Sequence, residues 1–360
     1  MLVADLISIL ISCWGVSSMV VTPVAGSSCT ITDYSEVSKV VSSCTKIVLK
    51  SFEVPAGKTL NLNLQPGTFL IIDGTIKFGK SNWAGPLVKI QGRRIKVSGT
   101  PGSVFDGQGA EYWDGKGSQG TKKPVLLRVN AHESEFYNIN LLNCPLRCAS
   151  IGGSDIFLNG WTIDVSEAGN LGVNTDGFDV SGHNMTIINS RVFNQDDCVV
   201  VNRGSDMFFQ NIYCKGGHGL SVAVGIDPTV YENNVVSNIT YQDCIVENSI
   251  NGIHVKTVKG GGPGLISNVN YNRIRMMNIK EFAIRIHQDY PSNDKKPVGN
   301  VPIDDLKISH VEGNMKGPRS SVVEVLCASG ACSNWKWSDI SVTGNKLPCS
   351  MNYKPSGFSC

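Results

Sequence analysis

The 360-residue sequence lacks the charge pattern that accompanies nucleic-acid binding. Charged residues make up only 17% of the chain, the formal net charge is +2, and no block of Lys and Arg stands out. A basic patch is the usual electrostatic footprint of a nucleic-acid-binding protein, so we expect no nucleic-acid partner. Because the overall field is weak, any acidic substrate must be held by local cations.

Groups of metal ligands are also scarce. The six His are scattered and the 12 Cys form no Cys-x-x-Cys pair, so the spacings do not favour a zinc site. We therefore expect no metal and no cofactor. Hydrophobic residues make up 41% of the chain, a share that excludes disorder and leaves ample material for a core.

Long apolar runs are missing except at the start of the chain. Residues 6–21 are largely apolar, and small residues follow at 24–26. This pattern predicts a signal peptide over 1–26 and a single mature domain over 27–360, and hence a secreted, extracellular protein. A membrane anchor is the alternative, although Gly and Ser interrupt any longer apolar span. We expect a monomer with no membrane attachment after removal of the signal.

Cysteine usage fits an oxidising compartment. Cys13 leaves with the signal, and most of the remaining Cys lie in close pairs that suit short-loop disulfides. Cys244 is left over, and we expect a buried free thiol there. Two N-glycosylation acceptor sequences begin at Asn184 and Asn238.

Short runs rich in Val, Ile, Phe and Thr, punctuated by Gly and Asn, fill most of the chain, and only residues 34–43 favour a helix. Six runs carry Asn or Asp at a matching place, at positions 138, 159, 189, 211, 243 and 272. An irregular repeat of strand and turn predicts an all-β solenoid, a parallel β-helix, in which the matching residues form a ladder of buried amides. An antiparallel sandwich is the alternative, but tight two-residue hairpin signals are scarce.

Three polar motifs lie within residues 174–220: Asn174-Thr175-Asp176, Gln195-Asp196-Asp197 and Gly217-His218-Gly219. Three carboxylates and a histidine can protonate a leaving oxygen and activate water, as glycoside hydrolysis requires. About 20 residues make one solenoid coil, so groups one coil apart can stack side by side. Each motif alone is usually a solvated turn, and only their combination predicts a site.

Asp196 and Asp197 pose a geometric difficulty. Adjacent residues of a regular strand point to opposite faces, so both can reach one cleft only if the chain bends or bulges there.

The order and spacing of these motifs, extended to Asp179, Cys198 and Ser221, resemble the signatures of the polygalacturonases over the whole chain after the signal. Members of that family are pectin-hydrolysing glycoside hydrolases with a right-handed parallel β-helix. They cleave the α-1,4-linked galacturonate backbone with inversion and without a metal. The resemblance implies a secreted enzyme that hydrolyses internal linkages of polygalacturonan.

By motif position, Asp196 resembles the general acid, and Asp176 and Asp197 resemble the pair that orients the nucleophilic water. Two neighbouring anions are expected to raise the pKa of Asp196, which would keep it protonated at mildly acidic pH. His218 resembles the family histidine that supports the acid. The motifs also supply candidate substrate-binding residues, namely Asn174, Gln195 and, from a Gln-Asp-Tyr that matches the family, Tyr290.

Substrate binding is where the sequence departs from the family pattern. The family carries an Arg-x-Lys that holds a galacturonate carboxylate, and the matching residues here are His254 and Lys256. Histidine has no bidentate fork and is charged only below about pH 6.5, so carboxylate binding should weaken by about 1–3 kcal/mol. Arg285 or His287 is a candidate to replace the missing cation.

A second departure follows His218, where residues 221–225 are one residue shorter than the family's glycine-rich equivalent. A shorter loop would move backbone groups at the floor of the cleft. The two departures leave two alternatives open: a catalytically impaired pectin-binding homologue, or a pectin hydrolase with a different backbone specificity.

The resemblance also implies four disulfides: Cys29–Cys44, Cys198–Cys214, Cys327–Cys332 and Cys349–Cys360. Cys144–Cys148 is a plausible fifth bridge.

Overall fold

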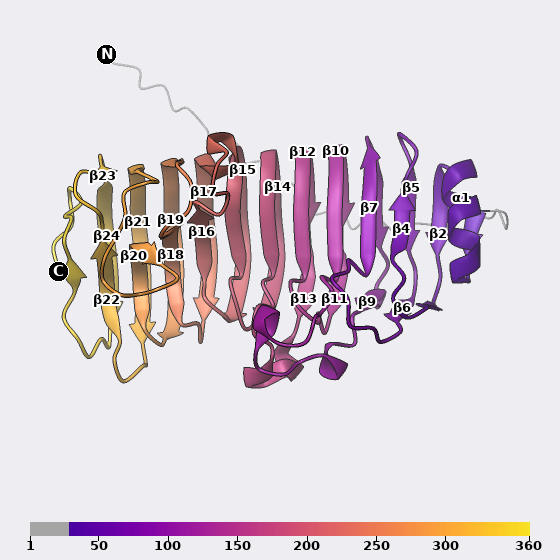
Figure 1. Cartoon of the computed structure of the whole chain (residues 1–360), viewed down its shortest axis with the longest axis horizontal. Coiled ribbons are helices and arrows are strands. Elements are labelled where there is room, and N and C mark those ends of the chain that lie inside the picture. Colours follow the sequence, from indigo (N-terminus) through magenta and orange to yellow (C-terminus); the bar gives the residue numbers. More distant parts are fainter. Residues whose placement is uncertain (1–28) are drawn as a thin grey trace, which may run out of the picture.

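The computed structural model describes residues 29–360, so the predicted signal peptide lies outside the described residues. The chain winds as a parallel β-helix from α1 (Val37–Ser43) at one end to β25 (Ser350–Met351) at the other (Figure 1). Neighbouring coils pair in parallel, as β12 (Ala149–Asn159) does with β10 (Leu127–Tyr137) and β14 (Phe178–Asn194). This confirms the all-β solenoid and excludes the sandwich. No helix in residues 29–360 is long and apolar enough to span a membrane.

One column of parallel strands carries the functional groups described below. It comprises the first halves of β10, β12 and β14, preceded by β4 (Leu60–Asn63) and β7 (Val88–Arg93) and followed by β15 (Val199–Gly216), β16 (Leu220–Val224), β18 (Asn251–Val258), β20 (Phe282–Tyr290), β22 (Ser321–Leu326) and β25. Its register places Arg128, Ser150 and Asp179 in one row across three coils.

Two further columns close each coil. One contains β1 (Thr30–Ile31), β2 (Lys46–Leu49), β5 (Phe69–Ile72), β8 (Lys96–Gly99), the middle of the long strands, β17 (Val235–Glu247), β19 (Leu265–Ile279), β21 (Ile303–Met315) and β24 (Lys336–Thr343). The other contains β3 (Phe52–Val54), β6 (Thr75–Phe78), β9 (Val104–Asp106), β11 (Asn140–Leu142), β13 (Thr162–Asp164) and the ends of the long strands. The short β23 (Cys332–Ser333) pairs with the start of β21.

The 3-10 helices lie in the connections: η2 (Tyr34–Glu36), η3 (Gly109–Glu111), η4 (Gly117–Gln119), η5 (Ser166–Leu171) and η6 (Tyr231–Asn234). The core fills the inside of the coils, where alternate strand residues point inward and stack on their equivalents in the next coil. The Phe209, Tyr241 and Tyr271 rings illustrate this, with successive centroids 4.7 and 4.8 Å apart.

The predicted Asn ladder exists, but on an exposed outer corner and not among buried amides. Asn211 Nδ2 donates to Asn189 Oδ1 at 2.8 Å, and Asn189 Nδ2 donates to Asn159 Oδ1 at 3.0 Å. Asn189 and Asn211 have φ of 53° and 54°, a left-handed conformation that Asn tolerates and that turns the strand around the corner. In the coil before Asn189 the corner residue is Gly160, with φ of 74°, and in the following coils an Asp243–Arg273 ion pair occupies the corner. Asn159 and Asn272 therefore each lie one residue before the equivalent position.

All four predicted disulfides are present, and Cys144–Cys148 is the fifth. Cys244 is buried and free, as expected. The short helix α1 lies within the range predicted for it.

Candidate active site

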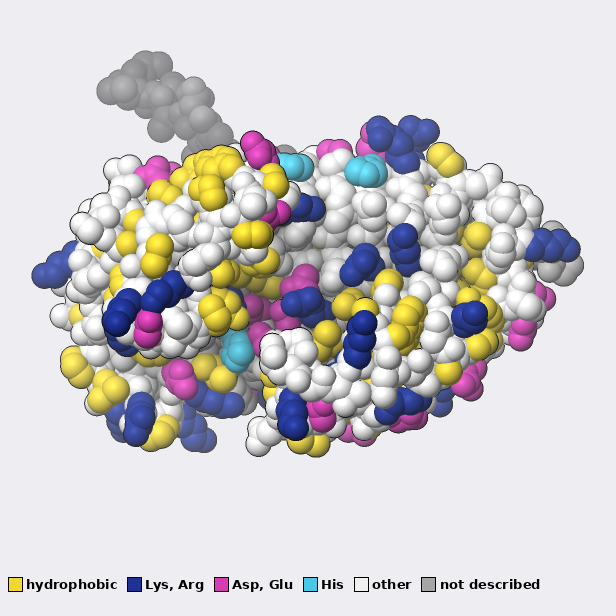
Figure 2. Space-filling model, in the orientation of Figure 1, with side chains coloured by type: hydrophobic (Ala, Val, Ile, Leu, Met, Phe, Trp, Pro, Cys, Tyr) yellow, Lys and Arg dark blue, Asp and Glu magenta, His cyan; other side chains and the backbone are white. Residues whose placement is uncertain are grey.

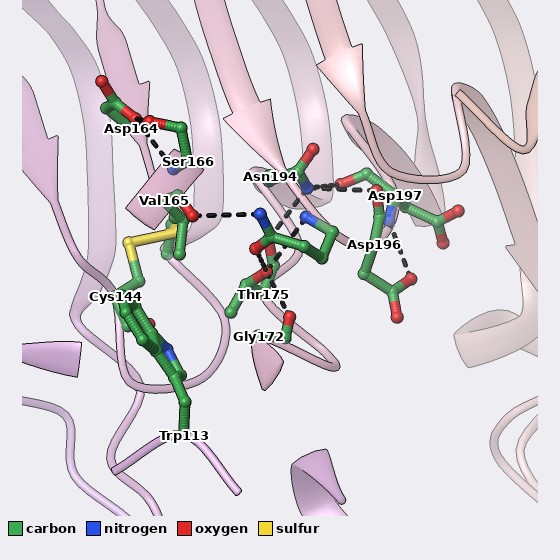
Figure 3. The surroundings of a disulfide bond; sticks show 12 residues. Trp113, Cys144, Asp164, Val165, Ser166, Gly172, Thr175, Asn194, Asp196 and Asp197 are labelled. Atoms are coloured by element: carbon green, nitrogen blue, oxygen red, sulfur yellow. Dashed lines mark hydrogen bonds between the residues drawn. A yellow bond between two sulfur atoms is a disulfide. The ribbon is translucent and has the colours of Figure 1, made fainter. Parts of the chain in front are cut away.

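Asp196 and Asp197 lie in a bend between β14 and β15. The bend was expected, because adjacent residues of a regular strand could not both reach one cleft. Asn194, at the end of β14, is buried and holds the bend (Figure 3). Its Nδ2 lies within hydrogen-bond distance of three carbonyl oxygens, those of Thr175 (2.8 Å), Asp197 (2.9 Å) and Asp196 (3.1 Å). The Asp196 and Asp197 carbonyls also accept the backbone N–H groups of His218 and Gly177, so the Asn194 amide ties the bend to bonds between the coils. Asn194 was not predicted from the sequence, although it directly precedes the Gln195-Asp196-Asp197 motif.

The bend opens onto a groove of about 630 Å³ that crosses the first strand column. Figure 2 shows acidic side chains at the bottom of this hollow. Residues from successive coils line it, including six of the predicted ones: Asn174, Asp176, Asp196, Asp197, Lys256 and Tyr290. His218 is not among the lining residues and reaches the site through its contact with Asp196. The structure therefore gathers groups up to 116 residues apart (290 − 174) into one site.

Asp196 is hydrogen-bonded on both oxygens. Its Oδ1 lies 3.0 Å from His218 Nδ1 and accepts the Asp197 N–H at 2.8 Å, and its Oδ2 accepts Asn174 Nδ2 at 3.3 Å. Burial opposes ionisation, but His218, Lys256 and the Asp197 N–H together lower the pKa of Asp196. Burial likewise disfavours a charged His218, yet the contact with Asp196 raises its pKa above 6.5.

The expectation that neighbouring anions keep Asp196 protonated is therefore wrong for the free protein. The proton of the Asp196–His218 pair rests on the histidine because the imidazolium is stabilised by the carboxylate it contacts. The two groups titrate as a unit, so the pair still holds one proton above pH 6.5.

Asp176 carries the raised pKa instead. Burial is the main cause, and the charges of Asp196, Asp179 and Asp197 add to it, while Arg147 opposes them. Asp176 Oδ1 is buried without a hydrogen-bond partner among residues 29–360. It is a buried acceptor that no group of these residues satisfies, which adds to the cost of ionising Asp176.

Asp197 is held by two donors. Ser221 Oγ–H donates to its Oδ1 at 2.6 Å, and Lys256 Nζ lies 2.8 Å from its Oδ2, with both side chains of the ion pair buried. Burial disfavours a charged Lys256, but Asp197 raises its pKa, so the ammonium persists. The same Nζ lies 4.9 Å from the ring centroid of Tyr290. Lys256 thus lines the groove with its charge committed to Asp197.

His254 does not act as a cation in the groove. It is 4% exposed, its Nε2 lies 3.0 Å from His287 Nε2, and the two rings stack with only 3° between their planes. Burial and then Lys256, His287 and Arg285 hold the pKa of His254 well below 6.5. The structure therefore corrects the expectation of a charge below about pH 6.5.

Neither candidate replaces the missing cation. Burial lowers the pKa of His287 to about 4, and its Nδ1 lies 2.7 Å from Asp289 Oδ1. Arg285 Nε pairs with Glu324 Oε2 at 2.8 Å. Neither residue lines the groove.

The Gln195 side chain bonds to neighbouring segments of the protein and not to the groove. Its Nε2 donates to the Val165 carbonyl at 3.0 Å and its Oε1 accepts the Thr175 hydroxyl at 3.1 Å, and it does not line the groove. Gln195 thereby anchors the turn that contains Thr175.

The shortened loop after His218 is not a loop. Residues 220–224 form β16, which pairs with β15 and, from Leu220 with Ile253 to Val224 with Thr257, with β18. The backbone at the floor of the cleft is therefore a continuous paired strand, and not the displaced loop that we expected.

Arg128, Arg147 and Asp179 also line the groove, and the sequence analysis did not assign them a role. Arg147 Nε lies 3.2 Å from Asp179 Oδ2, and burial raises the pKa of Asp179 to about 6 although Arg147 opposes the shift. Aligning the coils through the Arg128–Ser150–Asp179 row would have found Arg128 and Asp179, but not Arg147, which lies in the turn before β12.

The donor atoms of Asp196, Asp197 and His218 lie within 4.8 Å of one another, close enough to suit a metal ion. However, Lys256 already compensates Asp197, and His218 already contacts Asp196. A metal would compete with an ammonium 2.8 Å from one of its ligands.

The groove of this parallel β-helix gathers three buried carboxylates and a paired lysine, and a histidine contacts one of the carboxylates. This arrangement defines a glycoside-hydrolase type of site. Comparison with known proteins agrees. Residues 44–360 match the sequence profile of Glycosyl hydrolases family 28, and the chain belongs to that family.

Relatives span nearly the full chain. The polygalacturonase of Phaedon cochleariae is 44% identical over 94% of this chain and 95% of its own, and endopolygalacturonase I of Aspergillus oryzae is 39% identical over 93% and 92%. Endopolygalacturonase I of Stereum purpureum, solved with two galacturonate, has a TM-score of 0.81 at 33% identity over 91% and 97%. The endo-xylogalacturonan hydrolase of Aspergillus tubingensis shares the fold, with a TM-score of 0.80 at 22% identity over 92% and 98%.

Proposed function

We propose that the protein hydrolyses internal α-1,4-galacturonosyl linkages of pectin polygalacturonan with inversion. The observation that carries this proposal is the set of Asp176, the Asp196–His218 pair and the Asp197–Lys256 pair in one groove. The groove extends from Arg128 on β10 to Tyr290 on β20, which suits a polymer that continues on both sides of the cleaved bond. The names of the relatives support the substrate.

The Asp196–His218 pair supplies the acid. Moving its single proton from His218 to Asp196 leaves the number of bound protons unchanged, so Asp196 can protonate the glycosidic oxygen when that oxygen lies within reach. Departure of the protonated oxygen leaves an electron-poor anomeric carbon, which water attacks from the opposite face.

Asp176 and Asp197 position and activate the attacking water. The Asp176 carboxylate accepts a hydrogen bond from the water and takes up its proton, and Lys256 pairs with Asp197 beside it. Because the pKa of Asp176 is raised, its deprotonation should set the acidic limb of activity, while proton loss from the Asp196–His218 pair sets the alkaline limb.

Substrate contacts would come from Asn174 and Tyr290, with Arg128 and Arg147 as carboxylate-binding cations. The intact carboxylates and the names of the relatives favour this hydrolase over an impaired binding homologue or a different backbone specificity.

The same proposal includes a secreted monomer consisting of residues 27–360. Five disulfides support an oxidising compartment. Asn184 and Asn238 are exposed at strand corners, where a glycan would meet solvent.

Reducing-sugar release from demethylated polygalacturonic acid tests the function. Wild type is compared with Asp196→Asn and with Asp339→Asn, a matched change on an exposed surface residue. We expect activity in wild type and Asp339→Asn and its loss in Asp196→Asn. No release by a folded wild type, or full activity in Asp196→Asn, would contradict the proposal.

A further inference from the structure

The cations along the groove lie mainly on one side of the catalytic carboxylates. On the N-terminal side, Arg128 comes from β10 and Arg147 from the turn before β12. The C-terminal side consists of the remaining lining residues on and after β16: Ala223, Ile226, Lys256, Val258 and Tyr290. Lys256 is therefore the one cation that lines the C-terminal side within residues 29–360, and Asp197 already compensates it.

Cations with charge to spare are found elsewhere in the groove. Within the described part of the chain, Arg128 has no ion-pair partner at all, and Arg147 shares only Asp179, a carboxyl with a raised pKa of about 6. Arg203, on the catalytic coil itself, donates to the neutral amide oxygen of Asn233 at 2.7 Å. Free carboxylates of the substrate can be compensated at these positions.

The C-terminal side presents apolar surface instead. Ile226 is 61% exposed although it lines the groove, and Val258 is a second branched aliphatic lining residue on this side. Figure 2 shows hydrophobic side chains directly to the left of the acidic floor, over the C-terminal half, and Lys and Arg side chains to its right. Exposed apolar surface in a binding groove favours an apolar group of the ligand.

This wall is rigidly held. Residues 227–234 follow Ile226 in an excursion in which the Asp227 carboxylate accepts the backbone N–H of Thr229 and of Val230, each at 2.9 Å. Buried Asn234 donates to the Asp227 carbonyl at 2.7 Å and to the Pro263 carbonyl at 3.1 Å. These bonds hold the segment that directly follows Ile226.

We propose that the subsite on the C-terminal side of the catalytic carboxylates accepts an uncharged, methyl-esterified galacturonosyl unit, whereas the units over Arg128 and Arg147 must carry free carboxylates. This rests on the proposed function. A free carboxylate beside Lys256 would lie close to Asp197, and the lining residues on and after β16 supply no second cation to balance it. An ester carries no charge, and its methyl group can contact Ile226 and Val258. The neutral state of His254 supports the same asymmetry.

The test is digestion of partly methyl-esterified pectin in heavy-oxygen water, which labels each new reducing end. Tandem mass spectrometry then locates the esters in the products relative to the cleaved bond. We expect esters on the unit at one side of that bond and their exclusion from the other. Activity on demethylated polymer with esters excluded from both sides, or tolerated equally on both, would overturn this inference alone. Inactivity on every polymer would overturn the proposed function as well.

Ile226→Lys tests the position of the subsite by placing a cation on its exposed wall. We expect its rate on esterified relative to demethylated substrate to fall roughly tenfold, since it offers a free carboxylate a partner. Ile226→Met changes the shape of the side chain without adding charge, and so separates loss of isoleucine from gain of a cation. An unchanged ratio in Ile226→Lys would overturn the assignment.

Discussion

Replacing His218 with glutamine should remove stability in a pH-dependent way. Glutamine can still donate a hydrogen bond to Asp196 but cannot carry a charge. The His218 side chain is 29% exposed and that of Asp196 is 12% exposed, so we take the lower end of the range for a charge-assisted hydrogen bond, about 1.5 kcal/mol. This loss should appear as an increase in the fraction unfolded at a given urea concentration.

The sign of the pH dependence follows from the raised pKa of His218. Folding strengthens proton binding, so the stabilisation is complete below the ordinary pKa of 6.5 and disappears as pH rises through the higher folded-state pKa. Wild type should exceed His218→Gln in unfolding free energy by about 1.5 kcal/mol near pH 5, and the difference should shrink as the pH rises above 6.5 and through the raised folded-state pKa. Urea unfolding at a pH below this range and at one above it measures the change.

The pH dependence of activity should also change in His218→Gln. Without His218 the acid must rely on the proton of Asp196 alone, so the alkaline limb of kcat/KM should shift to lower pH and kcat should fall. His183→Gln is the matched control, because His183 is exposed and contacts Ser205 away from the groove. An equal loss of stability at both pH values, with an unmoved alkaline limb, would refute the charged His218–Asp196 pair.

Three other substitutions test the supports of the site. Lys256→Met should leave Asp197 buried and unpaired, costing about 3–5 kcal/mol in urea unfolding and nearly all activity; a loss below about 1 kcal/mol would contradict the buried pair. Cys198→Ala with Cys214→Ala should cost about 3 kcal/mol, since the bridge closes a 16-residue separation within the catalytic coil; unchanged thermal unfolding would argue against it. Gly204→Ala should cost at least about 3 kcal/mol, because its φ is 107° and a Cβ would lie 1.7 Å from the Gly182 carbonyl oxygen; a stable variant would show that the coils can separate there.

The solenoid could be predicted from the sequence because its repeat is local. Each strand alternates inward and outward residues, and each corner needs a left-handed residue, so Asn189 and Asn211 recur at matching places. The repeat did not show that these corners face solvent, since an exposed and a buried ladder have the same spacing. It also could not separate loop from strand at 220–224, where every residue is buried.

The residues of the site were largely predictable, but their charge states were not. Asp176, Asp196, Asp197, Lys256 and Tyr290 were found by motif, and all of them line the groove. The pKa of each carboxylate depends on hydrogen-bond donors from other coils, such as His218 beside Asp196. A sequence motif does not specify how close such a donor lies. Gln195 was misplaced for a similar reason, because its side chain bonds to Val165, 30 residues earlier.

His254 and Lys256 show how strongly partners determine the charge in this groove. The two residues point to the same side of β18 and both are buried, yet one is neutral and the other charged. Lys256 keeps its proton because Asp197 lies 2.8 Å away, whereas His254 faces His287 and has cations on neighbouring positions. The departure from the family Arg therefore removes a charge from the C-terminal side without disturbing the Asp197–Lys256 pair. Hydrolysis depends on that pair, and carboxylate preference depends on the missing charge, so we expect the replacement to change which units are accepted and not whether the bond is cleaved.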